Sequence, residues 1–203
     1  MKLYIVRHGQ TEWNVEKRMQ GWGDSPLTQT GIRDAGLLRE RIKEVPFDEA
    51  WASPLKRAEQ TADILVPDQQ IHVHEGLKEM RLGSMEGKRQ EDLHPSEKKT
   101  WQTFWEDPER FQPNGGETYG EVEKRVNGFL EDISRTSSGN VLLVTHTVVI
   151  KLLINRFEDR PLRRIWEPPY VHETCLTIVD WDGTNGKIEV SCSIDHTKAG
   201  RGW

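Results

Sequence analysis

The sequence is poor in cysteine and has no long apolar run, and both shortages exclude whole classes of protein. Only two cysteines occur in 203 residues, Cys175 and Cys192. Two are too few for a disulfide framework, so we expect buried, reduced thiols. No apolar stretch approaches the length of a membrane span, and the four-residue run before Arg7 is too short for the core of a secretory signal. We therefore expect a cytoplasmic protein that does not bind a membrane.

Positive charge is also in short supply. Lys and Arg number 28 against 33 Asp and Glu, which gives a formal net charge of −5. That balance argues against a general nucleic-acid binder, and any anionic substrate must be held by a local group of arginines. Hydrophobic residues make up 34% and charged residues 30% of the chain. At this length, we expect residues 1–203 to form a single globular domain.

Strand and helix patterns alternate along most of the chain. Apolar runs predict strands over 2–6, 47–53, 70–75, 140–146, 174–181 and 187–195. Helical spacing and capping signals predict helices over 29–45, with Thr28 as N-cap, 54–65, with Pro54 in the first turn, 118–135 and 147–157. This alternation predicts an α/β fold, a three-layer sandwich whose mostly parallel sheet is flanked by helices. The irregular segment 84–117 is expected to be a small helical insertion or lid.

Basic and titratable side chains follow the predicted strands. The first strand ends at Arg7 and His8, the second runs into the segment of Arg57, the third precedes Glu79, and a later one ends at His146. Ligands of such folds bind at the carboxyl ends of strands. Arginine matches phosphate oxygens, a neutral histidine can attack phosphorus, and a carboxylic acid can protonate the leaving oxygen. The set suits phosphoryl transfer without a metal or cofactor.

Six motifs in the same order strengthen this interpretation. They resemble the histidine phosphatase superfamily, whose members share the phosphoglycerate-mutase-like fold, and they cover residues 3–150. The motifs are RHGQTEWN, QGWGDSPLTQTG, SPLKRAEQTA, KEMRLGSMEG, NGGETYGEVEKRV and VLLVTHTVV. The resemblance implies a histidine acid phosphatase-type enzyme that hydrolyses phosphoric monoesters.

The resemblance also implies a role for each matched residue. His8 would be the phosphorylated nucleophile and Glu79 the proton donor, while Arg7, Arg57 and His146 would bind the phosphoryl group. The further substrate-binding candidates are Asn14, Gln20, Gly21 and Thr147. Thr147 replaces the glycine usual in the family, and Met85 stands where an aromatic residue is frequent. His196 and His172 are weaker candidates for the neighbourhood of the site.

Three functions are compatible with these motifs. The chain resembles most the short bacterial broad-specificity phosphatases, and the short interval between Glu79 and the helix over 118–135 favours a hydrolase. The alternatives are a cofactor-dependent phosphoglycerate mutase and a non-catalytic phospho-ligand binder. The substrate would be a small-molecule phosphate ester. A partly aromatic pocket, which would favour bulky or apolar leaving groups, is suggested by Trp22, Trp101, Trp105 and Tyr170. Trp166 could line a pocket as readily as fill a core.

Two other motifs suggest different chemistry and are set aside. DWDGT at 180–184 resembles the signature of haloacid-dehalogenase-like phosphatases, but only 19 residues follow Thr184, and DGTNG suits a hairpin turn. The histidines of HVH, at 72 and 74, have metal-ligand spacing, but no acidic or cysteine motif accompanies them. We expect solvated strand histidines there and no metal site.

Overall fold

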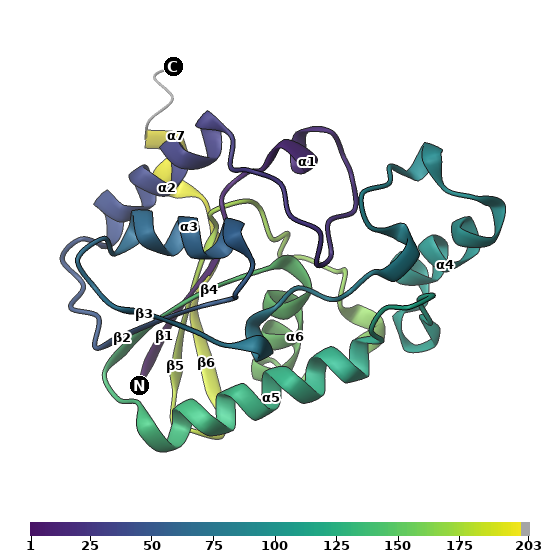
Figure 1. The fold of residues 1–203 in the computed structure, drawn as a ribbon. Coiled ribbons are helices and arrows are strands. Elements are labelled where there is room, and N and C mark those ends of the chain that lie inside the picture. The colour runs from purple at the N-terminus through teal and green to yellow at the C-terminus, as the bar shows by residue number, and fades with distance from the viewer. Residues whose placement is uncertain (200–203) are drawn as a thin grey trace.

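A six-stranded mixed sheet forms the middle layer of the computed structural model, which describes residues 1–199 (Figure 1). The strands lie in the order β3-β2-β4-β1-β5-β6. The first four of these are mutually parallel, whereas β5 runs antiparallel to β1, and β6 to β5. Their bounds are β1 Lys2–Arg7, β2 Glu49–Ala52, β3 Ile71–Val73, β4 Asn140–Thr145, β5 Leu176–Trp181 and β6 Gly186–Ser193. The predicted mostly parallel sheet is confirmed.

Helices cover both faces of the sheet, because alternate residues of its buried strands point to opposite sides. Val6 packs in one apolar cluster with residues of α2 (Gln29–Ile42) and α3 (Lys56–Leu65). Its neighbour Ile5 packs in a second cluster with residues of α5 (Tyr119–Thr136) and α6 (Thr147–Phe157). Figure 1 shows α2 and α3 on one side of the sheet and α5 on the other. The predicted three-layer sandwich is confirmed.

The remaining elements surround the carboxyl ends of the parallel strands or lie beside the sheet. The short helix α1 (Glu12–Val15) follows β1, α4 (Pro95–Glu106) lies at one end of the molecule, and α7 (Asp195–Ala199) follows β6 (Figure 1). Short 3-10 helices span Glu75–Leu77, Gly83–Met85, Gln90–Asp92, Pro108–Arg110 and Leu162–Arg164. The segment 84–117 is therefore helical in part, with α4 as its longest element.

Several predicted boundaries were wrong, and each has a local cause. Pro54 lies outside α3, because Leu55 is extended and serves as the N-cap. The strand predicted over 70–75 ends at Val73, because the His74 side chain accepts the Gly76 amide and caps a 3-10 helix. The strand predicted from Thr174 begins two residues later, because Thr174 has a φ of 54°. Thr28 is the N-cap of α2, as predicted.

The two cysteines are buried and free, as the sequence predicts. Asp182 accepts the amides of Thr184 and Asn185 in the turn between β5 and β6, which confirms the predicted hairpin. In residues 1–199, no helix combines the length and the apolar character needed to cross a membrane.

Candidate active site

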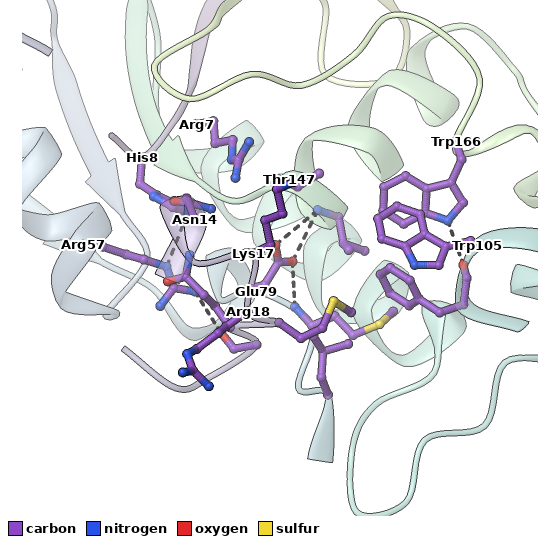
Figure 2. A pocket seen from close by; sticks show the side chains of 17 residues that line it. Arg7, His8, Asn14, Lys17, Arg18, Arg57, Glu79, Trp105, Thr147 and Trp166 are labelled. Atoms are coloured by element: carbon purple, nitrogen blue, oxygen red, sulfur yellow. Dashed lines mark hydrogen bonds between the residues drawn. The ribbon is translucent and has the colours of Figure 1, made fainter. Parts of the chain in front are cut away.

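A cavity of about 260 Å³ lies at the carboxyl ends of β1 and β4, beside the first residues of α3 and α6. Eight of the nine predicted site residues line it: Arg7, His8, Asn14, Gln20, Gly21, Arg57, Glu79 and Thr147. In Figure 2, Arg7, Arg57 and His8 lie on one side of the cavity, and Trp105 and Trp166 lie on the opposite side. Glu79 and Thr147 lie between these two groups. The fold therefore brings together motifs that are far apart in the sequence.

His8 is held in one tautomer. Its Nδ1 lies 2.7 Å from the carbonyl oxygen of Gly9, to which it donates, and its Nε2 accepts the Nε–H of Arg57 at 3.3 Å. Burial lowers the pKa of His8 well below its ordinary value, and the positive charges of Arg57 and Arg7 lower it further. The imidazole is thus neutral, with its Nε2 lone pair beside a guanidinium group.

Arg57 is almost fully buried and is fixed by the loop that follows Gln20. Its Nη2 donates to the carbonyl oxygen of Gly21 at 2.8 Å, and its Nη1 donates to that of Gly23 at 2.8 Å and to Asp24 Oδ1 at 3.1 Å. Burial lowers the pKa of Arg57, although Asp24 opposes this effect. Asp24 balances only part of the positive charge at the base of the cavity.

Arg7 is anchored from the segment that precedes β5. Its Nη1 donates to the carbonyl oxygen of Val171 at 2.8 Å and lies 3.3 Å from Glu173 Oε1. Within the described chain, its buried Nε makes no hydrogen bond. An anion at the cavity floor would supply the partner that this donor lacks.

His146 packs beside His8 and is not among the residues that line the cavity. The two ring centroids are 5.1 Å apart, and His146 Nε2 lies 2.7 Å from the hydroxyl of Ser53 at the end of β2. Burial, followed by the charge of Arg57, lowers the pKa of His146 well below its ordinary value. Its Nδ1 is buried without a hydrogen-bond partner among residues 1–199.

The Glu79 carboxylate meets the start of α6. Its Oε1 accepts the amide of Met80 at 2.8 Å, and both its oxygens lie 3.3–3.4 Å from the amide nitrogen of Val148. Burial raises the pKa of Glu79 above its ordinary value, and the amides and Arg57 limit the rise. Two neighbouring carboxylates lie elsewhere: Glu75 is exposed, and Glu86 accepts the amides of Trp22 and Leu82.

Asn14 and Gln20 are tied to each other through Thr11. Asn14 Oδ1 accepts from the amide and the hydroxyl of Thr11 at 3.0 and 2.9 Å, and Gln20 Nε2 donates to the same hydroxyl at 2.9 Å. These bonds fix one edge of the cavity. Sequence reasoning missed Thr11 and Ser53, and also Lys17, Arg18 and Met19 on the cavity wall.

An aromatic wall faces the basic side of the cavity. Trp105 and Trp166 have ring centroids 4.5 Å apart, and Trp166 Nε1 donates to the carbonyl oxygen of Phe104 at 2.8 Å. Met80 and Leu82 complete the apolar surface. Of the four residues on which an aromatic pocket was predicted, only Trp105 belongs to the wall: Trp22, Trp101 and Tyr170 do not line the cavity, and Tyr170 is two-thirds exposed. Trp166, which the sequence left open between pocket and core, lines the cavity.

The weaker candidates do not enter the site. His172 is exposed, and His196 is buried with its Nε2 3.2 Å from the hydroxyl of Thr174. Met85 is a core residue. His72 and His74 lie against the ring of Trp51 and are each partly exposed.

Comparison with known proteins relates the chain to one family, whose matched members include phosphatases and a probable phosphoglycerate mutase. Residues 3–193 match the profile of the histidine phosphatase superfamily (branch 1). The chain is 31% identical over 183 residues to an adenosylcobalamin/alpha-ribazole phosphatase of Salmonella typhimurium, covering 89% of this chain and 90% of the relative. It is 30% identical over 164 residues to a probable phosphoglycerate mutase, GpmB, of Yersinia pestis, covering 79% and 76%.

The solved structure of Bacillus stearothermophilus YhfR superposes with a TM-score of 0.90 at 37% identity, covering 96% of this chain and 98% of that one. Its likeness extends over both helical layers and the whole sheet, since nearly all of each chain is covered. The chain described here belongs to the histidine phosphatase superfamily.

Proposed function

We propose that this protein is a phosphomonoesterase that hydrolyses small phosphate esters through a phosphohistidine on His8. The observation that carries the proposal is the hydrogen bond of Arg57 Nε to His8 Nε2, with Nδ1 bound to Gly9. It leaves a neutral imidazole whose lone pair faces a phosphate-binding cation. A binding module would need the arginines but not a nucleophile with a lowered pKa or a carboxylic acid beside it.

The reaction takes place in two steps. In the first, the Nε2 lone pair of His8 attacks phosphorus, the bond from phosphorus to the leaving oxygen breaks, and protonated Glu79 gives its proton to that oxygen. In the second, the Glu79 carboxylate takes a proton from water, the water oxygen attacks phosphorus, and the N–P bond breaks. Inorganic phosphate leaves, and His8 regains its lone pair.

The basic groups stabilise the charge of the transferring phosphoryl group. Arg7 Nε lacks a hydrogen-bond partner within residues 1–199, and Arg57 lies beside the nucleophilic nitrogen. If Ser53 donates to His146 Nε2, the proton of the neutral imidazole resides on Nδ1, which can then donate to a phosphoryl oxygen. Arg7 and Arg57 supply positive charge and His146 a further hydrogen-bond donor, all without a metal ion, so the proposal requires no cofactor.

The aromatic wall favours apolar leaving groups. Glu79 lies between the phosphate-binding side and the wall of Trp105 and Trp166, so a leaving oxygen near Glu79 directs the rest of the substrate toward the wall (Figure 2). Aromatic rings in such a wall bury apolar surface and stack on planar groups. We therefore propose monoesters with aromatic or branched apolar leaving groups as the preferred substrates.

Replacement of the acid tests this function. Glu79→Gln should lower kcat/KM for an alkyl phosphate, whose leaving oxygen needs a proton, by about 10²-fold or more, the usual contribution of general acid catalysis. It should lower kcat/KM for p-nitrophenyl phosphate far less, because p-nitrophenolate leaves without a proton. Glu75→Gln is the matched control, because Glu75 is exposed and pairs with Lys78 outside the cavity. Equal losses on both esters would remove Glu79 from the acid role.

A further inference from the structure

A single arginine of α5 holds the backbone segment that carries Glu79. Arg125 Nη1 donates to the carbonyl oxygens of Gly76 and Lys78 at 3.0 and 2.7 Å, and Nη2 donates to that of Glu79 itself at 2.9 Å. Three carbonyl groups of one turn thus converge on one planar guanidinium group. Its remaining hydrogen bonds go to a carboxylate.

Glu117 fixes Arg125 in a two-point ion pair. Glu117 Oε1 accepts Arg125 Nε at 2.8 Å, and Oε2 accepts Nη2 at 3.0 Å, a bidentate geometry that sets the plane of the guanidinium group. The same carboxylate accepts the amide of Arg81 at 2.8 Å, and the Glu117 amide donates to the Arg81 carbonyl oxygen at 2.8 Å. Glu117 therefore holds the chain on the far side of Glu79.

The two glycines before Glu117 permit this close approach. A Cβ on Gly116 would overlap the carbonyl oxygen of Arg81, and Gly115 has a φ of 74°. Glu117 of the motif NGGET and Arg125 of α5 therefore together hold residues 76–81 through hydrogen bonds to their backbone. Neither Glu117 nor Arg125 lines the cavity, so these two residues do not touch the substrate.

We infer that Arg125, oriented by Glu117, is a positioning residue that sets where the Glu79 carboxyl meets the leaving oxygen. The inference rests on the proposed acid role of Glu79. Among residues 1–199, the Glu79 carboxylate has the adjacent Met80 amide and the long contacts to Val148 N at 3.3–3.4 Å as its hydrogen bonds, so its place depends on its backbone. Loss of the arginine would remove a donor from three carbonyl groups of that backbone and shift the acid, although Trp22 Nε1 would still donate to the Glu79 carbonyl oxygen at 2.8 Å.

The test compares two esters in three single variants. Arg125→Met should lower kcat/KM for an alkyl phosphate by about 10²-fold, the cost of a displacement of roughly 1 Å in a reacting group. It should lower kcat/KM for p-nitrophenyl phosphate much less, because that ester does not need the acid. Arg125→Lys should recover part of the alkyl phosphatase activity. Arg135→Met, on an exposed turn of the same helix, is the matched control and should leave both esters unaffected.

The double variant separates positioning from a general structural role. In the Glu79→Gln background, Arg125→Met should cause no further loss on the alkyl phosphate, since the group it positions is already gone. Equal losses of Arg125→Met on the two esters, or a full additional loss in the double variant, would overturn the inference.

Two further controls keep the outcome interpretable. If Arg125→Met does not fold, as judged by its circular dichroism and thermal unfolding, Arg125→Lys and Glu117→Gln supply the comparison and should show a smaller loss that is again greater on the alkyl phosphate than on p-nitrophenyl phosphate. If Glu79→Gln itself shows no split, the acid role fails. If Glu79→Gln shows the split and the Arg125 and Glu117 variants do not, only the positioning role fails.

Discussion

Gly21→Ala should destabilise the protein and weaken the phosphate site together. Gly21 has a φ of 53°, in the left-handed region, and a Cβ there would overlap Oε1 of Glu86. That oxygen accepts the amides of Trp22 at 3.0 Å and Leu82 at 2.9 Å. An alanine must therefore either displace Glu86 from both amides or shift the loop that holds Arg57.

The size of the effect follows from these contacts. The left-handed backbone costs about 1–2 kcal/mol for a residue with a Cβ. Each amide that loses its partly buried acceptor costs about 1 kcal/mol, so the free energy of unfolding should fall by about 3–4 kcal/mol. Because the Gly21 carbonyl oxygen accepts Arg57 Nη2, a shift of the loop also moves this arginine. The affinity for inorganic phosphate, the product of the proposed reaction and therefore an expected competitive inhibitor, should fall with it.

Urea unfolding of the variant measures the free energy of unfolding, and inhibition of turnover by phosphate measures the affinity for phosphate. Gly128→Ala in α5 is the matched control, because its Cβ would meet no atom within 4 Å. That change should stabilise the protein by about 0.4–1 kcal/mol, as glycine-to-alanine changes in compatible positions do. A Gly21→Ala protein within about 0.5 kcal/mol of the wild type, the range of ordinary surface changes, would refute the reasoning.

Two other predictions concern metal removal and pH. Within the described residues, no three His, Cys, Asp or Glu side chains gather into a metal site, so EDTA should leave turnover unchanged; loss with EDTA and recovery with Mg²⁺ would contradict this. His8 and His146 have folded-state pKa values well below the ordinary 6.5. Below pH 6.5 the unfolded chain therefore binds more protons, so the free energy of unfolding should fall as pH drops from 6.5 toward those lowered values. His8→Gln should show a smaller fall between pH 7.5 and 5 in urea unfolding.

The fold and the basic side of the site could be predicted because strand ends are visible in the sequence. Apolar runs end at Arg7, His8 and His146, and this pattern places the three side chains at one edge of a sheet. The same runs do not indicate the order of the parallel strands within the sheet. The order itself, with β4 between β1 and β2, depends on helix packing across the sheet, which leaves no local pattern.

Other parts of the site depend on contacts between distant segments. Trp166 reaches the aromatic wall through its bond to the Phe104 carbonyl oxygen, 62 positions away, and nothing around either residue indicates the pairing. Arg125 looks like an ordinary helix charge in the sequence, because its three acceptors are carbonyl groups of another segment. His146 also depends on a distant contact, since its Nε2 lies 2.7 Å from the hydroxyl of Ser53, 93 positions away, and its role in binding the phosphoryl group stays a prediction.

The most direct measurement traps the intermediate. Wild-type protein mixed with a radiolabelled phosphate ester and quenched within milliseconds should carry acid-labile, base-stable label on the peptide that contains His8. If the reaction is allowed to continue instead of being quenched, this label should be released as inorganic phosphate. The same result is expected when 3-phosphoglycerate is added as acceptor together with a catalytic amount of 2,3-bisphosphoglycerate. His8→Ala should carry no label and release no phosphate. Full turnover by His8→Ala would contradict the phosphohistidine, and rapid transfer of the label to 2-phosphoglycerate would make the protein a mutase.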